Sequence, residues 1–460
     1  MKRKPAKTRT SIVCGTDFTD NARQAGNVAA SLAAKLHQRL LLVHAAEQSS
    51  DRRLSPETLR ALLKPVRDDL RREATRLRQL GATVVEELHS GKADEVLVRR
   101  ARESGAHLVV VSSLGATTAK RRLLGSVAER TAESSPVPTL VVQSAAPFET
   151  WLRGERPLRV FVGFDFTVTA EAAVEWVRHL RLAGPCEVTV GYTNWPPEEH
   201  ERFGVRSHTS AFENPPLVQQ AFERDLRDKM TLLLGNDDTH VRVQAGWGRA
   251  DFTLMGMAKA AQADLIVTGT HQRHGLPRLW NASVSRGLLH YAATSVACVP
   301  VVATPRRVPR VPVIRRVLVT TDCSPLGNHA IAYACAVTQP GGVLRLVHVV
   351  HPRAIAGGQF ETQLGSTARH ASYVQTLGRR LQGLLPPDAQ GLGITVEAGV
   401  VECEDTAKGI RQEAERYGAD VIVMGSQGLS GVARVVLGSV AQAVMTHSRR
   451  PVFLVRPPKE

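Results

Sequence analysis

One segment recurs three times at a nearly constant interval, and this repeat limits what the chain can fold into. Each copy starts with a short apolar run, passes through a loop and leads into a pattern of helical spacing. The copies read LVVVSSLGATTAKRRLLGSV at 108–127, LIVTGTHQRHGLPRLWNASV at 265–284 and VIVMGSQGLSGVARVVLGSV at 421–440. Gly125 and Ala282 are 157 residues apart, and Ala282 and Gly438 are 156 residues apart. A period this regular predicts three tandem copies of one domain.

Copy three carries a glycine pattern, G-x2-G-x9-G-S, formed by Gly425, Gly428, Gly438 and Ser439. The pattern follows a run that is typical of a strand buried on both faces, and it precedes a helix. Glycine lets backbone N–H groups approach an anion without an intervening Cβ. Gly-Ser at a helix start adds a hydroxyl and the positive end of the helix dipole. The alternative is a turn with a helix cap, but the spacing favours a phosphate-binding loop.

The other two copies retain less of this pattern. Copy one keeps three residues of the pattern, Gly115, Gly125 and Ser126. It has Ser112 in the place of Gly425, and this side chain narrows the approach to a phosphate. Copy two keeps two residues and replaces two glycines: Gly269 and Ser283 are kept, and Gln272 and Ala282 are the replacements. We therefore expect the best site in copy three, a weaker one in copy one and none in copy two.

Strands and helices alternate through each copy, which predicts a parallel sheet with helices on both faces. We expect domains at 1–146, 157–304 and 313–460, consistent with roughly 150 residues per domain. The linkers are expected at Gln143–Pro157 and Thr304–Pro312, and the polar, proline-bearing segment Asn194–Pro216 is interpreted as a loop.

An aspartate follows the first strand of each copy: Asp17, Asp165 and Asp322. Ligands of such sheets bind at the carboxyl ends of the strands near the switch point. Each aspartate should therefore share a crevice with the glycine loop of its copy. The alternative is that these carboxylates only cap helices.

Composition excludes several classes of protein. The sequence has no run of about 18 apolar residues, so we predict no membrane span, and no apolar segment follows the basic start MKRKPAKTRT, which argues against a secretory signal. The six cysteines form no CxxC pair, as expected for reduced thiols in a cytoplasmic protein. The net charge of +16 comes from arginines spread over all copies, and only 5% of residues are aromatic. A solvated basic surface is favoured over nucleic-acid binding.

The chain resembles the universal stress protein family over nearly its whole length. The residues that carry the resemblance are Asp322 after the first strand, His348-Val349-Val350 after the second, and the glycines and serine of copy three. The resemblance implies three tandem doubly wound α/β domains, each with a mostly parallel five-stranded sheet (adenine nucleotide alpha hydrolase-like). It also implies a regulatory role in stress responses, with ATP as the ligand and Mg²⁺ as its accompanying ion.

In ATP-binding relatives, the first-strand aspartate lies near the nucleoside, the backbone after strand two meets the adenine, and the glycine loop holds the phosphates. Carried over, the resemblance implies these residues in copy three: Asp322, Val349, Gly425, Gly428, Gly438 and Ser439. In copy one it implies Asp17, Ala45, Gly115, Gly125 and Ser126, with Ser112 as the departure. In copy two only Asp165, Gly269 and Ser283 match.

Other functions remain open at this point. A slow ATP hydrolase would use Asp322 with a metal ion, but the sequence offers neither a second carboxylate beside it nor an evident general base. A receiver domain phosphorylated at Asp17 or Asp322 lacks the expected acidic cluster, and a scaffold without nucleotide is a further alternative. His271 and His274 form an HxxH that is more typical of a polar loop than of a metal site.

The odd number of copies bears on assembly. Family domains commonly pair through their last strands, which here are expected at Thr139–Val142, Val296–Val302 and Pro451–Val455. Two copies can pair inside the chain, which leaves the third with an open edge. We expect a homodimer through that edge; the alternative is that a linker such as Gln143–Pro157 covers it.

Overall fold

The computed structural model describes residues 11–46, 56–114, 124–205, 213–235, 239–270, 284–301, 313–352, 366–426 and 437–456. The chain divides into two compact units. The first unit comprises Met1–Asn194 and Leu226–Pro305, and therefore holds copy one and most of copy two. The second comprises Trp195–Asp225 and Arg306–Glu460, and therefore holds copy three together with a segment of copy two.

The first unit contains a ten-stranded sheet in the order β3-β2-β1-β4-β5-β10-β9-β6-β7-β8. The strands of copy one are β1 (Ser11–Gly15), β2 (Arg39–Ala46), β3 (Thr83–Ser90), β4 (Leu108–Ser112) and β5 (Thr139–Val142). Those of copy two are β6 (Leu158–Gly163), β7 (Cys186–Asn194), β8 (His240–Ala245), β9 (Leu265–Thr270) and β10 (Ser295–Pro300). Each half is parallel, and β5 and β10 join the halves in antiparallel register, with Val141 opposite Val296.

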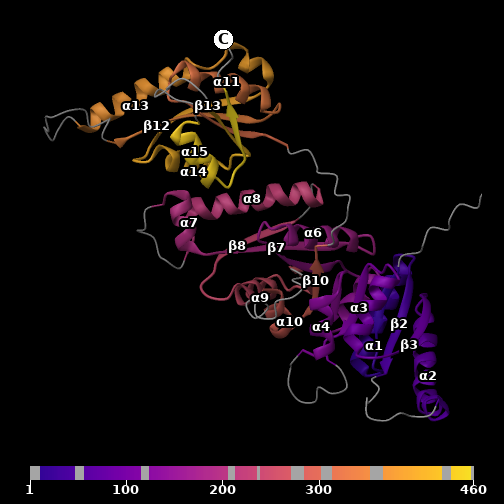
Figure 1. The fold of residues 1–460 in the computed structure, drawn as a ribbon. Helices are drawn as coiled ribbons and strands as arrows, with labels where there is room; N and C mark the ends of the chain where they lie inside the picture. The colour runs from indigo at the N-terminus through magenta and orange to yellow at the C-terminus, as the bar shows by residue number, and fades with distance from the viewer. Residues whose placement is uncertain are drawn as a thin grey trace, which may run out of the picture. The chain divides into compact units, whose positions relative to one another are not determined.

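Helices flank this sheet on both faces (Figure 1). Copy one contributes α1 (Asp20–Lys35), α2 (Pro56–Arg78), α3 (Ala93–Glu103) and α4 (Ser126–Ser134). Copy two contributes α6 (Val168–Leu180), α8 (Pro216–Leu234), α9 (Ala250–Ala260) and α10 (Val284–Tyr291), and the C-terminal part of α8 belongs to this unit. Copies one and two also meet through Glu129 of α4, which accepts from Arg286 of α10 at 2.9 Å. The two copies therefore satisfy one another's last strands inside the chain, as the edge argument predicts.

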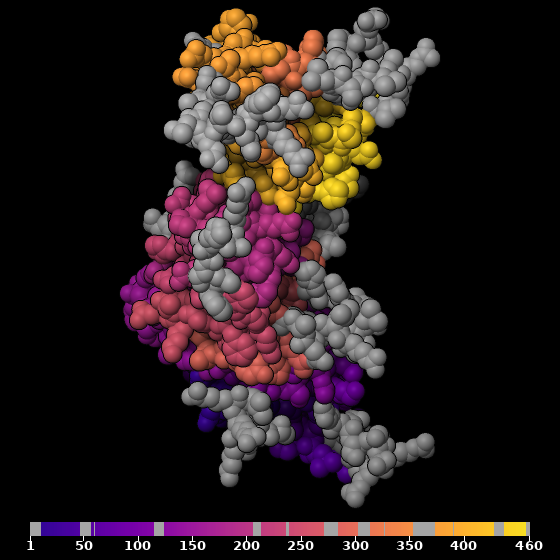
Figure 2. Space-filling view, turned by 90° about the vertical axis from the view of Figure 1, so that its left-hand side faces the viewer, coloured from indigo at the N-terminus to yellow at the C-terminus, as the bar shows by residue number. Residues whose placement is uncertain are grey.

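The second unit contains a five-stranded parallel sheet in the order β13-β12-β11-β14-β15. Its strands are β11 (Arg316–Thr320), β12 (Val343–Val350), β13 (Thr395–Glu402), β14 (Val421–Gly425) and β15 (Val452–Val455). Copy three contributes the helices α11 (Pro325–Val337), α13 (Ser366–Gln382), α14 (Thr406–Tyr417) and α15 (Ser439–His447), with a 3-10 turn at Pro387–Leu392. In the space-filling view, the described residues of copy three are coloured orange to yellow (Figure 2).

Alternation along β11 explains the three layers of copy three. Val317 and Val319 belong to one buried cluster, with apolar residues of α11 and α13, whereas Leu318 belongs to a second cluster, with residues of α14 and α15. Successive side chains of a strand point to opposite faces, so a central strand that is apolar throughout needs helices on both sides. The predicted doubly wound α/β fold is confirmed.

The first helix of every copy begins in the same way. Thr19, Thr167 and Ser324 are the N-caps of α1, α6 and α11, and each side-chain oxygen accepts from the backbone N–H three residues later. The shared cap is local evidence that the three copies are one repeated fold.

Two segments that the sequence presents as connections contain helices. The linker Gln143–Pro157 holds α5 (Ala146–Leu152), whose Phe148 and Trp151 are buried in the core of the first unit. The expected loop Asn194–Pro216 holds α7 (Pro196–Phe203), so the loop prediction was wrong there. Proline is tolerated in the first turn of a helix, and Gly204, at φ 61°, ends α7 in a left-handed conformation. The second linker, Thr304–Pro312, lies outside the described residues.

Candidate functional site

A cavity of about 280 Å³ opens at the carboxyl ends of β11, β12 and β14 in copy three. Strand β11 pairs with β12 on one side and with β14 on the other, so the cavity lies at the switch point of the sheet. Five of the six residues predicted for this copy line it: Asp322, Val349, Gly425, Gly438 and Ser439. The sixth, Gly428, lies outside the described residues.

The N-terminus of α15 forms one wall of the cavity. Gly438 is the N-cap, with an extended ψ of 146°, and it offers no side-chain oxygen to the first N–H groups of the helix. Its own N–H donates to the Ser426 carbonyl at 2.9 Å, which fixes the loop against the end of β14. Ser439, Val440 and Ala441 of the first turn line the cavity. A helix start of this kind favours an anionic group.

The Asp322 carboxylate is held by the start of α11. Its Oδ1 accepts from the Ser324 backbone N–H at 3.0 Å and from the Ser324 hydroxyl at 2.5 Å. The residue between them, Cys323, has a left-handed φ of 62°, and its N–H donates to the Thr321 hydroxyl at 2.9 Å. Ser324 is itself the cap of α11, so Asp322 orients the cap residue and does not take its place.

A glycine brings α11 close to that carboxylate. A Cβ added at Gly327 would lie 2.3 Å from Asp322 Oδ1, well inside contact distance. Gly327 lines the cavity but belongs to no glycine motif, which is why sequence reasoning missed it. The Asp-x-Ser/Thr pattern, present in all three copies, was the available signal for the aspartate's setting.

A histidine contributes a polar group to the same cavity. His348 Nδ1 lies 2.7 Å from the Thr321 carbonyl oxygen, and a carbonyl can only accept, so Nδ1 carries the proton. The apolar lining comes from Val349, Ile410 and Met424. Burial raises the pKa of the neighbouring Cys323 thiol, which keeps it protonated and unsuited to nucleophilic chemistry. The cavity thus combines an apolar wall, a carboxylate and a helix N-terminus.

Copy one repeats much of this arrangement. Asp17 follows β1, Ala45 lies in β2 and Ser112 ends β4, and β1 pairs with both other strands. Gly125 is the N-cap of α4 and donates to the Ser113 carbonyl at 2.8 Å, as Gly438 does in copy three; Ser126 begins the helix.

Copy one also differs from copy three. The Ser112 hydroxyl donates to the Leu114 carbonyl at 3.0 Å, and Gly115 lies outside the described residues. Phe18 stands where copy three has Cys323, and its ring stacks on His44 with centroids 4.7 Å apart.

Copy two departs further. Asp165 keeps its hydrogen bonds from Thr167, at 3.1 Å to the backbone N–H and 2.5 Å to the hydroxyl. Tyr192 replaces the histidine, and its ring packs edge-on against Phe166 at 5.3 Å. A Cβ at Gly269 would lie 2.4 Å from the Thr169 carbonyl oxygen, so this glycine is required by packing against α6. Ser283 lies outside the described residues.

Two further kinds of feature are absent from the described residues. Within those residues, no three His, Cys, Asp or Glu side chains are grouped to hold a metal ion. None of the helices described here combines the length and the hydropathy that crossing a bilayer requires. The HxxH of His271 and His274 lies outside the described residues.

Comparisons with known proteins agree on one family. The model of the universal stress protein family matches residues 8–143, 158–300 and 314–456. A universal stress protein of Mycobacterium tuberculosis is 26% identical over 314 residues, which are 65% of this chain and 96% of that protein. One of Thermus aquaticus is 34% identical over 146 residues, which are 31% of this chain and 98% of that protein.

The solved structures that resemble this chain include two universal stress proteins. A universal stress protein from Archaeoglobus fulgidus has 14% identity and a TM-score of 0.47, and the match covers 63% of this chain and 96% of that one. A universal stress protein in complex with cAMP has 30% identity and a TM-score of 0.26, and the match covers 30% of this chain and 99% of that one. Because the three segments matched by the family model make up most of the sequence, this chain belongs to the universal stress protein family.

Proposed function

We propose that copy three binds an adenine nucleotide, ATP, and that the protein is a nucleotide-dependent regulator. The observation that carries the proposal is the cavity at the β11–β14 switch point, around which Asp322, Val349, Gly425, Gly438 and Ser439 come together. Backbone N–H groups at the start of α15 would donate hydrogen bonds to the phosphate oxygens, because that end of the helix favours negative charge. The Asp322 carboxylate would accept hydrogen bonds from the ribose hydroxyls, and the backbone at Val349 would meet the adenine.

Copy one is the second proposed site, because it repeats the aspartate, the helix start and the histidine of copy three. Its residues would be Asp17, Ala45, Gly115, Gly125 and Ser126, with the Ser112 hydroxyl turned to the backbone. Copy two is proposed to bind no nucleotide, since Gln272 and Ala282 replace two glycines of the motif and Tyr192 stands where the other copies have a histidine. The three copies would act as domains 1–146, 157–304 and 313–460 of a cytoplasmic protein.

Binding without rapid turnover is favoured over hydrolysis. Asp322 is the one carboxylate among the described residues that line the cavity. A Mg²⁺ ion would therefore be held mainly by the phosphates with Asp322 nearby, and no second carboxylate from the described lining would activate water.

The test uses three matched variants of the full chain: Asp322→Ala, Asp17→Ala and Asp165→Ala. Each removes a carboxylate that accepts the same two hydrogen bonds from a Thr or Ser cap, so the structural cost should be similar. We expect Asp322→Ala to weaken the tightest ATP binding event in calorimetry by about tenfold or more, or ~1.4 kcal/mol.

The other two variants give the comparison. Asp17→Ala should affect a weaker event, and Asp165→Ala should change nothing. Acid extraction and chromatography of the purified protein should release an adenine nucleotide. A chain that binds no ATP, or that loses equal affinity in all three variants, would favour a scaffold without nucleotide.

We also propose a homodimer through β15, one of the two end strands of the five-stranded sheet among the described residues. Phe453 of β15 is 39% exposed, whereas β5 and β10, which pair with each other, are buried throughout.

A further inference from the structure

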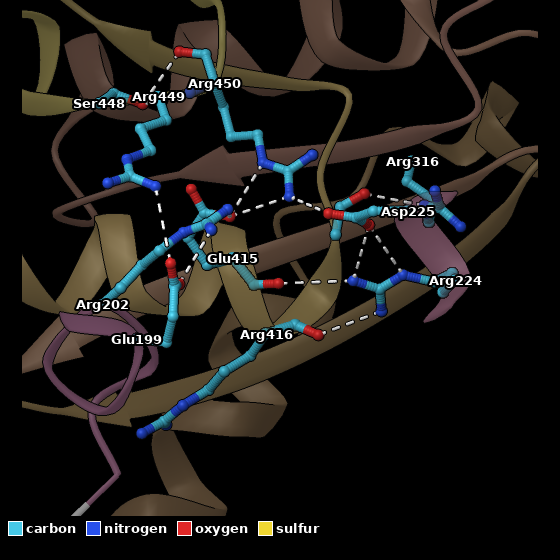
Figure 3. A network of polar contacts seen from close by, with 11 residues as sticks. Glu199, Arg202, Arg224, Asp225, Arg316, Glu415, Arg416, Ser448, Arg449 and Arg450 are labelled. Atoms are coloured by element: carbon cyan, nitrogen blue, oxygen red, sulfur yellow. Dashed lines mark hydrogen bonds and ion pairs between the residues drawn. The ribbon is translucent and has the colours of Figure 1, made fainter. Parts of the chain in front are cut away.

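A buried chain of alternating charges joins a segment of copy two to copy three inside the second unit (Figure 3). We call residues Trp195–Asp225, which include α7 and the start of α8, the docking segment. Its Arg202 contacts Glu415 of α14 at 2.6 Å, and Glu415 contacts Arg450 at 2.9 Å. Arg450 in turn contacts Asp225 of the docking segment at 2.7 Å.

These charges are largely removed from water. The Glu415 side chain is 6% exposed, and those of Arg202, Arg450 and Asp225 are 17%, 19% and 12% exposed. Buried ions are tolerated when paired, and removing one member leaves its partners uncompensated. The contact between the docking segment and copy three therefore depends on all four members of the charge network.

Arginines also connect the docking segment and α14 through the carbonyl groups at helix ends. The Arg416 guanidinium donates to the carbonyl oxygens of Phe203 at 2.7 Å and Gly204 at 3.0 Å, where α7 ends. The Arg224 guanidinium donates to the carbonyl oxygens of Glu415 at 3.4 Å and Arg416 at 3.3 Å, near the end of α14. Arginines at helix C-termini stabilise the last carbonyls, so Arg416 of α14 supports the end of α7, and Arg224 of α8 supports the end of α14.

An aromatic pair inside the docking segment supports Arg202. Phe203 and Phe222 are buried, and their rings pack edge-on with centroids 5.7 Å apart. The Arg202 guanidinium lies 5.1 Å from the first centroid and 5.5 Å from the second, within the range of a cation–π contact. Two rings therefore hold Arg202 in position for Glu415.

The repeat shows that this charge pattern is specific to copy three. Gly105, Gln262 and Gly418 are left-handed residues that follow equivalent helices, and the residues three positions earlier are Arg102, Lys259 and Glu415. Eleven residues after the helix-start serine, copies one and two have Val137 and Thr294, where copy three has Arg450. A cation at the position of Glu415 would repel Arg202, and an uncharged residue at the position of Arg450 could not pair with Asp225.

The two helices held by the docking segment also line the cavity. Thr406 and Ile410 of α14 contribute to the lining, as do the first residues of α15. Glu415 lies toward the other end of α14, and Arg450 follows the end of α15. The docking segment thus links the far ends of two helices whose near ends line the cavity.

We infer that the docking segment controls the cavity of copy three: when docked, it fixes α14 relative to α15, and ligand affinity in copy three depends on that docking. The inference rests on the proposed function only for the identity of the ligand as ATP. Thermodynamic linkage makes the coupling reciprocal, so ATP should stabilise the docked segment.

The test is Arg202→Gln in the full chain, with Arg102→Gln as the control on an exposed arginine of copy one. Hydrogen exchange of the amides of α7 reports docking, exchange in the first turns of α14 and α15 reports the cavity wall, and calorimetry reports ATP affinity. We expect Arg202→Gln to accelerate exchange in all three places by about tenfold or more and to weaken ATP binding about fivefold or more. Asp225→Asn, which acts through Arg450, should have the same effects.

Each outcome decides the inference. If α7 exchanges faster while the cavity wall and ATP affinity are unchanged, the segment is only a structural attachment and the inference is wrong. If Arg202→Gln leaves α7 protected, the network does not hold the segment and the inference also fails. If the parent chain binds no ATP, the proposed function fails, and exchange in the first turns of α14 and α15 still decides whether docking controls the cavity.

Discussion

At the scale of single residues, Gly327 distinguishes the aspartate of copy three from those of the other copies. Copies one and two have Ala22 and Ala170 at the equivalent position, so the fold accepts alanine there. In copy three a Cβ would lie 2.3 Å from Asp322 Oδ1 and displace the carboxylate. Gly327→Ala should therefore weaken ATP binding in copy three by about tenfold, or ~1.4 kcal/mol. Calorimetry with thermal melting checks this prediction, and Ala22→Gly is the matched control.

The same substitution separates ligand binding from stability. Alanine is favoured over glycine within a helix by about 0.5–1 kcal/mol, so the melting temperature should not fall much as affinity is lost. Unchanged affinity in Gly327→Ala would mean that the carboxylate can move without consequence, and that Asp322 does not position the ligand.

At the scale of elements, the docking of α7 should depend on pH through Glu415. Burial disfavours its charged form, but the guanidinium groups of Arg450 and Arg202 outweigh burial and lower the pKa of Glu415 below its ordinary value of 4.5. A carboxylate with a lowered pKa stabilises the docked state above its ordinary pKa, and this stabilisation is lost as the pH falls through the lowered value. Protection factors of the α7 amides should therefore decrease below pH 4.5.

Glu415→Gln supplies the baseline for this measurement, because its amide does not titrate. The remaining carboxylates of the network, Glu199 and Asp225, contact the same arginines and are present in both proteins. As the pH falls, the protection factors of the α7 amides should decrease more steeply in the parent than in Glu415→Gln. The difference between the two profiles measures the contribution of Glu415 to docking. Parallel profiles would show that the pairing of Glu415 does not hold α7 in place.

The elements also show how far the sequence could be interpreted. Hydrophobic runs of strand length and a constant period were enough to predict the doubly wound sheets, because these patterns are local and occur three times. The same patterns placed Asp322 and Gly438 at one crevice, since parallel strands end at the same edge. The docking of α7 was not predictable, because Arg202 and Glu415 lie far apart in the sequence and no repeat relates them. Gly327 was missed because its role depends on the distance between α11 and a carboxylate.

At the scale of the whole molecule, the end strand β15 of copy three predicts self-association. Strand β15 pairs with β14 on one side, and near it Phe453, Tyr333 and Met445 are 39%, 44% and 49% exposed. An exposed apolar edge strand is a template for pairing, and a two-fold dimer closes it by pairing β15 with its copy. The antiparallel pairing of β5 with β10 shows that last strands of this fold can join in this way.

We expect light scattering at micromolar concentration to give twice the chain mass of 49.9 kDa. Val452→Lys should shift the protein to one chain's mass, because a pair of dimer-related lysines would be placed at the seam, where like charges repel. Val313→Lys, a substitution at an exposed valine of the same unit outside β15, is the control and should remain dimeric. A parent protein with the mass of one chain would contradict the prediction. Dimers that persist in Val452→Lys would mean that another surface, and not β15, makes the contact.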